Sequence, residues 1–133
     1  MSITFDVTGD PKPQGSKRAF VTKHGKAVLV ESAGEPLKDW RTTVTVIASN
    51  EIRRQTWTTV DGPVSVTLNF RMKEPARPKH PTPAVRPDLD KLIRAVLDAL
   101  TTAGVWMDDS QVVNLTATKT YGQPGVEVTV CLS

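Results

Sequence analysis

Residues 88–109, DLDKLIRAVLDALTTAGVWMDD, carry the clearest structural pattern in the chain. Their apolar residues recur at the three- and four-residue spacing that buries one face of a helix: Leu89, Leu92, Ile93, Val96, Leu97 and Leu100. Asp88, preceded by Pro87, is suited to begin this helix. Gly104 is suited to end it, because glycine readily adopts a left-handed cap conformation. We therefore predict a helix with a pair of aspartates near each end.

The rest of the chain predicts short strands and one further helix. The predicted strands alternate apolar and polar residues or are short apolar runs, and they lie at residues 2–8, 17–21, 27–30, 64–72, 111–120 and 126–132. Residues 36–56 predict a helix from the three- and four-residue spacing of their apolar side chains alone, because the threonine-rich run within them has poor helix propensity.

The order of these elements predicts the fold class. The last two strands are separated only by a short turn at residues 121–125, so we expect them to form an antiparallel hairpin. The expected order is β-ββ-α-β-α-ββ. It predicts an α+β protein, a single two-layer domain over residues 1–133 with both helices on one face of a mixed sheet.

Length and composition exclude several other classes. The chain has 133 residues and no apolar run approaching the ~18 residues of a membrane-spanning helix. Its single cysteine, Cys131, excludes an internal disulfide and a cysteine-based zinc site. The first residues alternate like a strand and lack the order of a signal peptide. We expect a cytoplasmic protein with no membrane partner.

The positive charges are unevenly distributed. The formal net charge is only +3, yet cations crowd two regions: Lys12, Lys17, Arg18, Lys23 and Lys26, and then Arg71, Lys73, Arg77, Lys79 and Arg86. The second group lies mostly within residues 73–87, which are rich in proline and lack apolar periodicity, so we predict a mobile basic loop. Such clusters favour a polyanionic partner, nucleic acid first.

The two aspartate pairs allow two interpretations. Asp88 and Asp90 could simply cap the helix, with Asp108 and Asp109 as turn residues. Alternatively the pairs converge, and several carboxylates at one point then require a cation. Oxygen ligands without histidine or cysteine select Mg²⁺ or Mn²⁺. Arg94, four residues after Asp90, could form an ion pair with it or contact a phosphate.

The same segment resembles a known family. The matching residues are Asp88-Leu89-Asp90, Leu92, Ala95, Asp98-Ala99-Leu100, Ala103-Gly104, Trp106, Asp108-Asp109 and Gln111-Val112-Val113. At this spacing they resemble the RusA-type Holliday junction resolvases, small homodimeric endonucleases often encoded by phages and prophages. The matching string covers about a quarter of the chain, and the family's α+β fold agrees with the expected element order.

The resemblance implies Mg²⁺-dependent cleavage of four-way DNA junctions in a bacterial host cell, with Mn²⁺ as a possible substitute. It places the essential, metal-binding carboxylates on Asp88, Asp90 and Asp109, and leaves Asp108 dispensable. The family's lysine falls on Arg94, which cannot donate a proton near neutral pH, so Arg94 or Lys91 takes that role. The cations expected to contact DNA phosphates are Lys17, Arg18, Arg77, Lys79 and Arg86. Two alternatives remain: a non-catalytic DNA-binding phage protein, and a nuclease of broader branched-DNA specificity.

Overall fold

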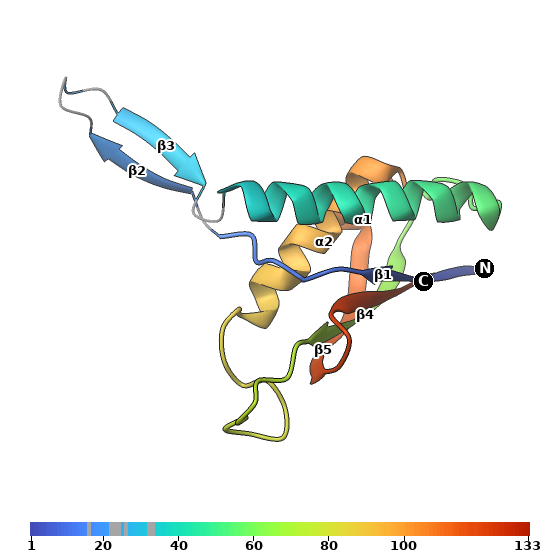
Figure 1. Cartoon of the computed structure of the whole chain (residues 1–133). Helices are drawn as coiled ribbons and strands as arrows, with labels where there is room; N and C mark the ends of the chain where they lie inside the picture. Colours follow the sequence, from blue (N-terminus) through green and yellow to red (C-terminus); the bar gives the residue numbers. More distant parts are fainter. Residues whose placement is uncertain (16, 22–24, 26, 32–33) are drawn as a thin grey trace.

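Two helices lie against one face of a four-stranded sheet in the computed structural model of the chain (Figure 1). The structure describes residues 1–15, 17–21, 25, 27–31 and 34–133, and only the backbone course of 17–21 and 27–31. The elements are β1 (Ser2–Thr8), β2 (Lys17–Val21), β3 (Ala27–Glu31), α1 (Gly34–Arg54), β4 (Val64–Met72), α2 (Leu89–Ala103), the 3₁₀ helix η1 (Asp109–Gln111), β5 (Val112–Tyr121) and β6 (Gly125–Leu132). No helix in these ranges is long and apolar enough to cross a membrane.

The sheet has the strand order β1-β6-β4-β5 and is mixed, as predicted. β4 and β5 run parallel, and α2 connects them as a crossover helix. β6 pairs antiparallel with both β1 and β4. The predicted hairpin of the last two strands is therefore wrong, because β4 lies between them. Their connection passes over the end of β4, where the Gly122 N–H donates to the Met72 carbonyl at 3.0 Å.

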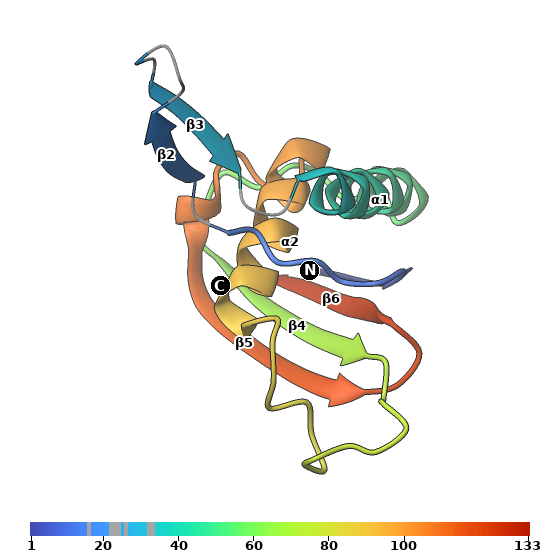
Figure 2. The same ribbon diagram turned by 60° about the vertical axis from the view of Figure 1, so that its left-hand side comes forward.

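The hairpin formed by β2 and β3 stands apart from this sheet. The two strands pair antiparallel from Lys17 opposite Glu31 to Val21 opposite Ala27, as the sequence predicted. They form their own two-stranded sheet (Figure 2). The order within the packed domain is therefore β-α-β-α-ββ, and the expected order, which counted the hairpin among the packed elements, is corrected.

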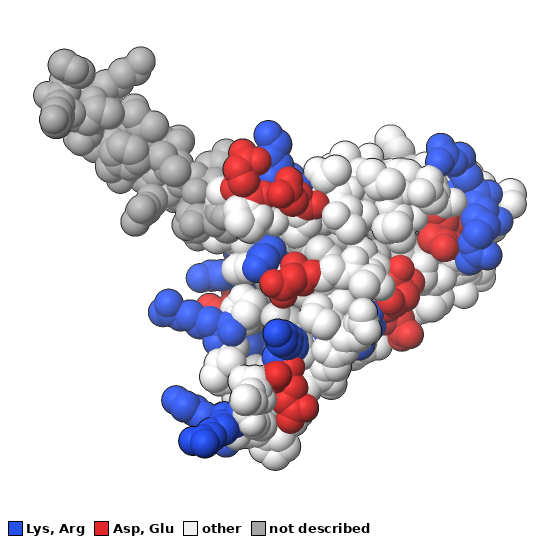
Figure 3. Space-filling model, in the orientation of Figure 1, with Lys and Arg blue, Asp and Glu red and all other residues white. Residues whose placement is uncertain are grey.

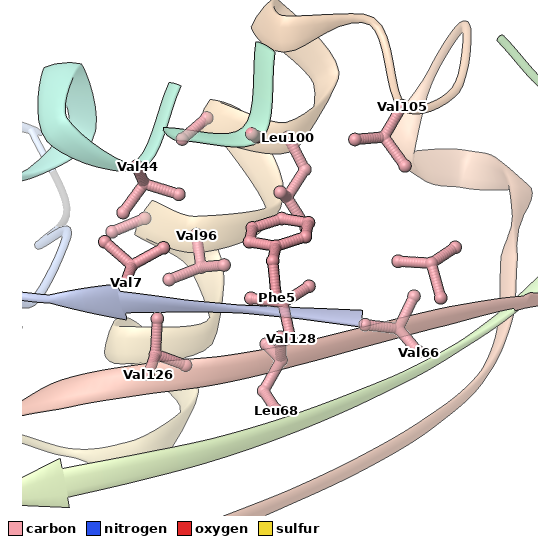
Figure 4. Packing of buried hydrophobic residues seen from close by; sticks show 14 of the residues in the cluster. Phe5, Val7, Val44, Val66, Leu68, Val96, Leu100, Val105, Val126 and Val128 are labelled. Carbon is pink, nitrogen blue, oxygen red and sulfur yellow. The ribbon is translucent and has the colours of Figure 1, made fainter. Parts of the chain in front are cut away.

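The core lies between the helices and the sheet (Figure 4). Alternate residues of each central strand are buried, including Val66, Leu68 and Phe70 of β4 and Val126, Val128 and Val130 of β6. α1 covers them with Leu37, Trp40, Val44 and Ala48. Its threonines fit the helix because Thr43 and Thr45 each donate a hydroxyl hydrogen bond to the carbonyl four residues earlier.

The crossover helix α2 has the predicted bounds. Asp88 is its N-cap and Gly104 its C-cap, with φ at 90° in the left-handed region. Leu92, Val96 and Leu100 are fully buried, whereas the predicted apolar face continues onto a half-buried flank. That flank consists of Leu89, Ile93 and Leu97. Ala99, on another side of the helix, receives a hydrogen bond from Thr45 of α1 at its carbonyl, so the flank lies on a different side of α2 from this contact with α1.

Candidate metal and nucleic-acid site

Asp88 lies at the N-terminal end of α2 with its carboxylate available to a ligand. It has the backbone conformation of an N-cap, but its side chain accepts no capping hydrogen bond. Its nearest charged partner is Lys91, whose Nζ lies 3.6 Å from Oδ2. Asp90 follows in the first turn and is exposed. The unpaired N–H groups and the dipole of the helix favour negative charge here, so this end of α2 suits acidic side chains.

A cavity of about 610 Å³ opens beside Asp88. Its lining combines two carboxylates with three cations, and its members are Asp10, Pro11, Lys12, Pro13, Met72, Arg86, Pro87, Asp88 and Lys91. Lys12 forms an ion pair with Asp10 at 2.9 Å. A smaller cavity of about 290 Å³ shares Asp10, Met72, Arg86 and Pro87 with it. In Figure 3 blue side chains gather, with red ones among them, along the left edge, where the basic loop meets α2. Mixed charges of this kind suit a phosphate together with a cation.

The basic loop at residues 73–87 leads directly into Asp88. It has no helix or strand and is exposed apart from Pro83 and Pro87. Arg77 and Lys79 are exposed in the loop, whereas Arg86 lines the cavity. The loop's predicted mobility remains a prediction. The side chains of Lys17 and Arg18 lie outside the described residues, so their predicted DNA contacts stay predictions as well.

Lys119 of β5 ties the end of this loop to the sheet. Its Nζ donates hydrogen bonds of 2.8 Å to the carbonyls of Val85 and of Pro87. Reasoning from the sequence missed this residue. In the strand, Lys119 pairs with the buried Phe70 and so lies on the helix-covered face of the sheet. A lysine at a position where alternation predicts an apolar residue was the signal that could have identified it.

The cations of α2 are arranged differently from the predicted ion pair. Arg94 is exposed and makes no salt bridge with Asp90 or Asp98 in the described part of the chain. Asp98 instead accepts a hydrogen bond from Gln14 Nε2 at 2.7 Å. Lys91 is thus the helix cation beside Asp88.

The second acidic pair lies beyond the other end of α2. Asp108 caps η1: its carboxylate accepts from the Ser110 N–H at 3.1 Å, and the Gln111 side chain accepts from the Asp108 N–H at 2.8 Å. Hydrogen bonding by Ser110 lowers the pKa of Asp108 below its ordinary value. Asp109 is exposed, and its carboxylate has no hydrogen bond to any described residue. Asp108 is therefore committed to local structure, and Asp109 is available.

One chain does not bring the two pairs together. Asp109 precedes the start of β5, where Val112 pairs with Val64, whereas Asp88 lies near the strand's other end, where Tyr121 pairs with Met72. The 15 residues of α2 span ~22 Å between them at 1.5 Å per residue. Accordingly, the described residues include no group of three or more potential ligands able to hold a metal. A shared site for Asp88, Asp90 and Asp109 stays a prediction, and it would need residues from two copies of the chain.

The fold and this surface define a class, a small α+β protein with available carboxylates beside cations that suit a polyanion. Residues 10–131 match the family described as Endodeoxyribonuclease RusA, and the chain belongs to that family, as its sequence motifs indicated. It is also 31% identical over 141 residues to Uncharacterized protein YqaN of Bacillus subtilis (strain 168), covering 96% of this chain and 94% of the relative. Membership of the family implies an endonuclease that acts on branched DNA.

Proposed function

We propose that this protein is a homodimeric, Mg²⁺-dependent endonuclease that resolves four-way DNA junctions by paired, symmetric nicks. One observation carries the proposal: Asp88 and Asp90 lie at one end of α2 and Asp109 beyond the other, each with an available carboxylate. A single chain therefore holds two incomplete halves of an acidic site. A second copy related by two-fold symmetry would complete both halves at once.

β5 supports such a dimer because it is one of the two outer strands of the sheet, at the opposite edge from β1 (Figure 2). Apolar side chains are exposed in its first half, with Val113 at 63% and Leu115 at 40% exposure, and Met107, just before η1, is 68% exposed. Leu89, Ile93 and Leu97 of α2 are also only partly buried. Natural proteins usually cover or blunt an exposed apolar strand edge, so a partner subunit is expected here.

The symmetry of an edge-to-edge pairing would also bring the carboxylates together. If β5 pairs antiparallel with the same strand of a second copy, the start of one strand lies beside the end of the other. Asp109 of the partner subunit then approaches Asp88 and Asp90. The dimer would hold two such sites, related by the two-fold axis, and two symmetric sites suit two symmetric nicks.

The residues of this chain divide the chemistry between them. Asp88, Asp90 and the partner's Asp109 would hold the metal, and their carboxylates without histidine or cysteine fit Mg²⁺ or Mn²⁺. When bound, such an ion lowers the pKa of a water and stabilises charge on the phosphodiester. Lys91, Lys12 and Arg86 line the cavity beside Asp88 and would orient the phosphate. Arg94, exposed one turn along the helix, would contact the DNA farther out.

A mixed-dimer experiment tests this proposal. Asp90→Asn and Asp109→Asn are each expected to abolish cleavage of a synthetic four-way junction in Mg²⁺. When the two variants are co-expressed, the mixed dimer contains one site with both changes and one intact site. It should therefore nick the junction on one strand without resolving it, because only one of its two sites is whole.

The outcomes of that experiment are distinct. Nicking by the mixed dimer requires that Asp90 and Asp109 act across the subunit boundary, since sites built within one chain would both be damaged. An inactive mixture beside an active wild-type protein would exclude the shared site. A wild-type protein that binds the junction but never cuts it would instead favour the non-catalytic alternative, and equal cutting of flaps would favour the broader nuclease.

A further inference from the structure

Lys119 holds the backbone on the N-terminal side of Asp88 in place. Its Nζ donates 2.8 Å hydrogen bonds to two carbonyls, those of Val85 and Pro87, which end the basic loop. Pro87 is the residue immediately before Asp88, so these bonds fix the peptide from which the Asp88 side chain projects. An ammonium group bound to two backbone carbonyls is a strong, charge-assisted tether.

The helix holds Asp88 from its other side. The Asp88 carbonyl accepts from the backbone N–H groups of Lys91 at 3.2 Å and Leu92 at 3.1 Å. The carboxylate itself has no capping hydrogen bond, and its only ion pair within the described residues is the long one to Lys91. The direction of the Asp88 side chain therefore depends mainly on its backbone, which Lys119 and α2 fix together.

The location of Lys119 also makes an electrostatic demand on its surroundings. A cation near the positive end of a helix is unfavourable unless acidic groups lie close by. Here the N-terminal turn of α2 supplies Asp88 and Asp90. Lys119 is also half-buried, on a strand face otherwise turned toward the core. Its two carbonyl acceptors and these carboxylates, and not apolar packing, therefore account for a cation at this position.

We propose that Lys119 is a positioning residue for the metal site: it aims the Asp88 carboxylate by holding the Pro87–Asp88 backbone. Lys119 itself touches neither metal nor substrate in this arrangement. The role rests on the proposed function for its consequence, metal-dependent cleavage, but its structural part is independent. Residues that orient metal ligands typically affect metal affinity by about 10- to 100-fold when they are removed.

The test compares Lys119→Met with Lys119→Arg, which keeps hydrogen-bond donors, and with Lys38→Met. Lys38 is exposed on α1 and serves as a control for the removed charge. In the metal-free full-length protein, amide hydrogen exchange over residues 85–92 should be faster in Lys119→Met alone. Titration calorimetry with Mn²⁺ should show about tenfold weaker binding. The Mg²⁺ concentration for half-maximal junction cleavage should rise by a similar factor, with partial recovery in Lys119→Arg.

Several results would overturn this role. Unchanged exchange over residues 85–92 in Lys119→Met would show that the tether is unimportant. Weaker junction binding in EDTA with unchanged Mn²⁺ affinity would make Lys119 a DNA-binding residue instead. If Lys119→Met does not fold, Lys119→Gln, which keeps a shorter donor, is measured in the same assays. A wild-type protein that does not cleave would contradict the proposed function alone, because the exchange measurement still decides whether Lys119 holds Asp88.

Discussion

Both ends of α2 carry a pair of aspartates, but the aspartates at the two ends make different contacts. At the N-terminal end, Asp88 occupies a capping position without a capping hydrogen bond, beside a cavity with three cations. Beyond the C-terminal end, Asp108 makes a complete capping box with Gln111, and its neighbour Asp109 is exposed. Capping therefore explains Asp108 fully but explains Asp88 only in part. An aspartate that occupies a cap position without using it is available for another task.

The comparison also shows that neither end suffices as a metal site. Two carboxylates lie in the first turn and only one available carboxylate lies beyond the far end. The cations of the candidate cavity accompany the first pair. We infer that the N-terminal end would bind the phosphate and supply two of the three metal-binding carboxylates. The far end would contribute the third carboxylate to the site of a second copy of the chain.

The largest expected effect comes from removing one carboxylate at each end. Asp90→Asn and Asp109→Asn should each lower junction cleavage by on the order of 10³-fold, because a missing metal ligand removes several kcal/mol of charge stabilisation. The double variant should be hardly worse than either single variant, since residues of one site act as a unit. Cleavage rates in Mg²⁺, with junction binding measured in Ca²⁺, check this expectation.

That experiment needs a control variant, and two results would contradict its expected outcome. Asp61→Asn changes an exposed turn aspartate and should cleave at the wild-type rate. Multiplicative losses in the double variant would indicate that the two ends of α2 serve separate functions. Loss of junction binding in Asp90→Asn would place that residue in DNA recognition or folding.

A smaller effect is expected from the cations that accompany only the N-terminal end. Combined replacement of Arg77, Lys79 and Arg86 by Gln should weaken junction binding for all sequences alike. The slope of log K against log salt should fall by about 0.9 for each phosphate that the variant no longer neutralises. Fluorescence anisotropy across a salt series checks this, with Arg53→Gln and Arg54→Gln at the far end of α1 as the comparison for removed charge. An unchanged slope would exclude the loop from phosphate binding.

The sequence predicted α2 well because its signals are local. Apolar spacing, a capping aspartate and a terminal glycine all act within one or two turns, and the helix observed, Leu89–Ala103, has the expected bounds. α1 likewise agrees within two residues at each end. Periodicity remains informative even where propensity is poor, because burial of an apolar face outweighs propensity.

Strand pairing and the site depended on distant partners that no local signal identifies. β5 and β6 are neighbours in sequence, yet β4 separates them because its buried residues occupy the centre of the sheet. The two bonds from Lys119 to the basic loop join residues 34 and 32 positions apart. The sequence predicted an aspartate pair near each end of α2, but whether the pairs meet in one chain depended on the parallel pairing of β4 and β5, which no local signal identifies.

The smallest effect is expected at Asp108, the acid that the comparison assigns to structure. Because hydrogen bonding by Ser110 lowers its folded-state pKa, the ionised form stabilises the fold. That contribution is present above the unfolded-state pKa and is lost as the pH falls through the lower folded-state pKa. Asp108→Asn keeps a capping oxygen but no charge, so it should melt slightly below wild type at pH 7 and equally at strongly acidic pH.

Junction cleavage by Asp108→Asn should stay within about threefold of wild type, since a cap contributes to stability and not to a metal-bound transition state. Thermal melts across a pH series, with cleavage rates at pH 7, measure both expectations. A loss as large as that of Asp109→Asn would mean that Asp108 leaves its cap to bind metal. The capping box with Gln111, which holds η1 against the carbonyls of Val60 and Gly62, argues against such a movement because its loss would release the start of β5.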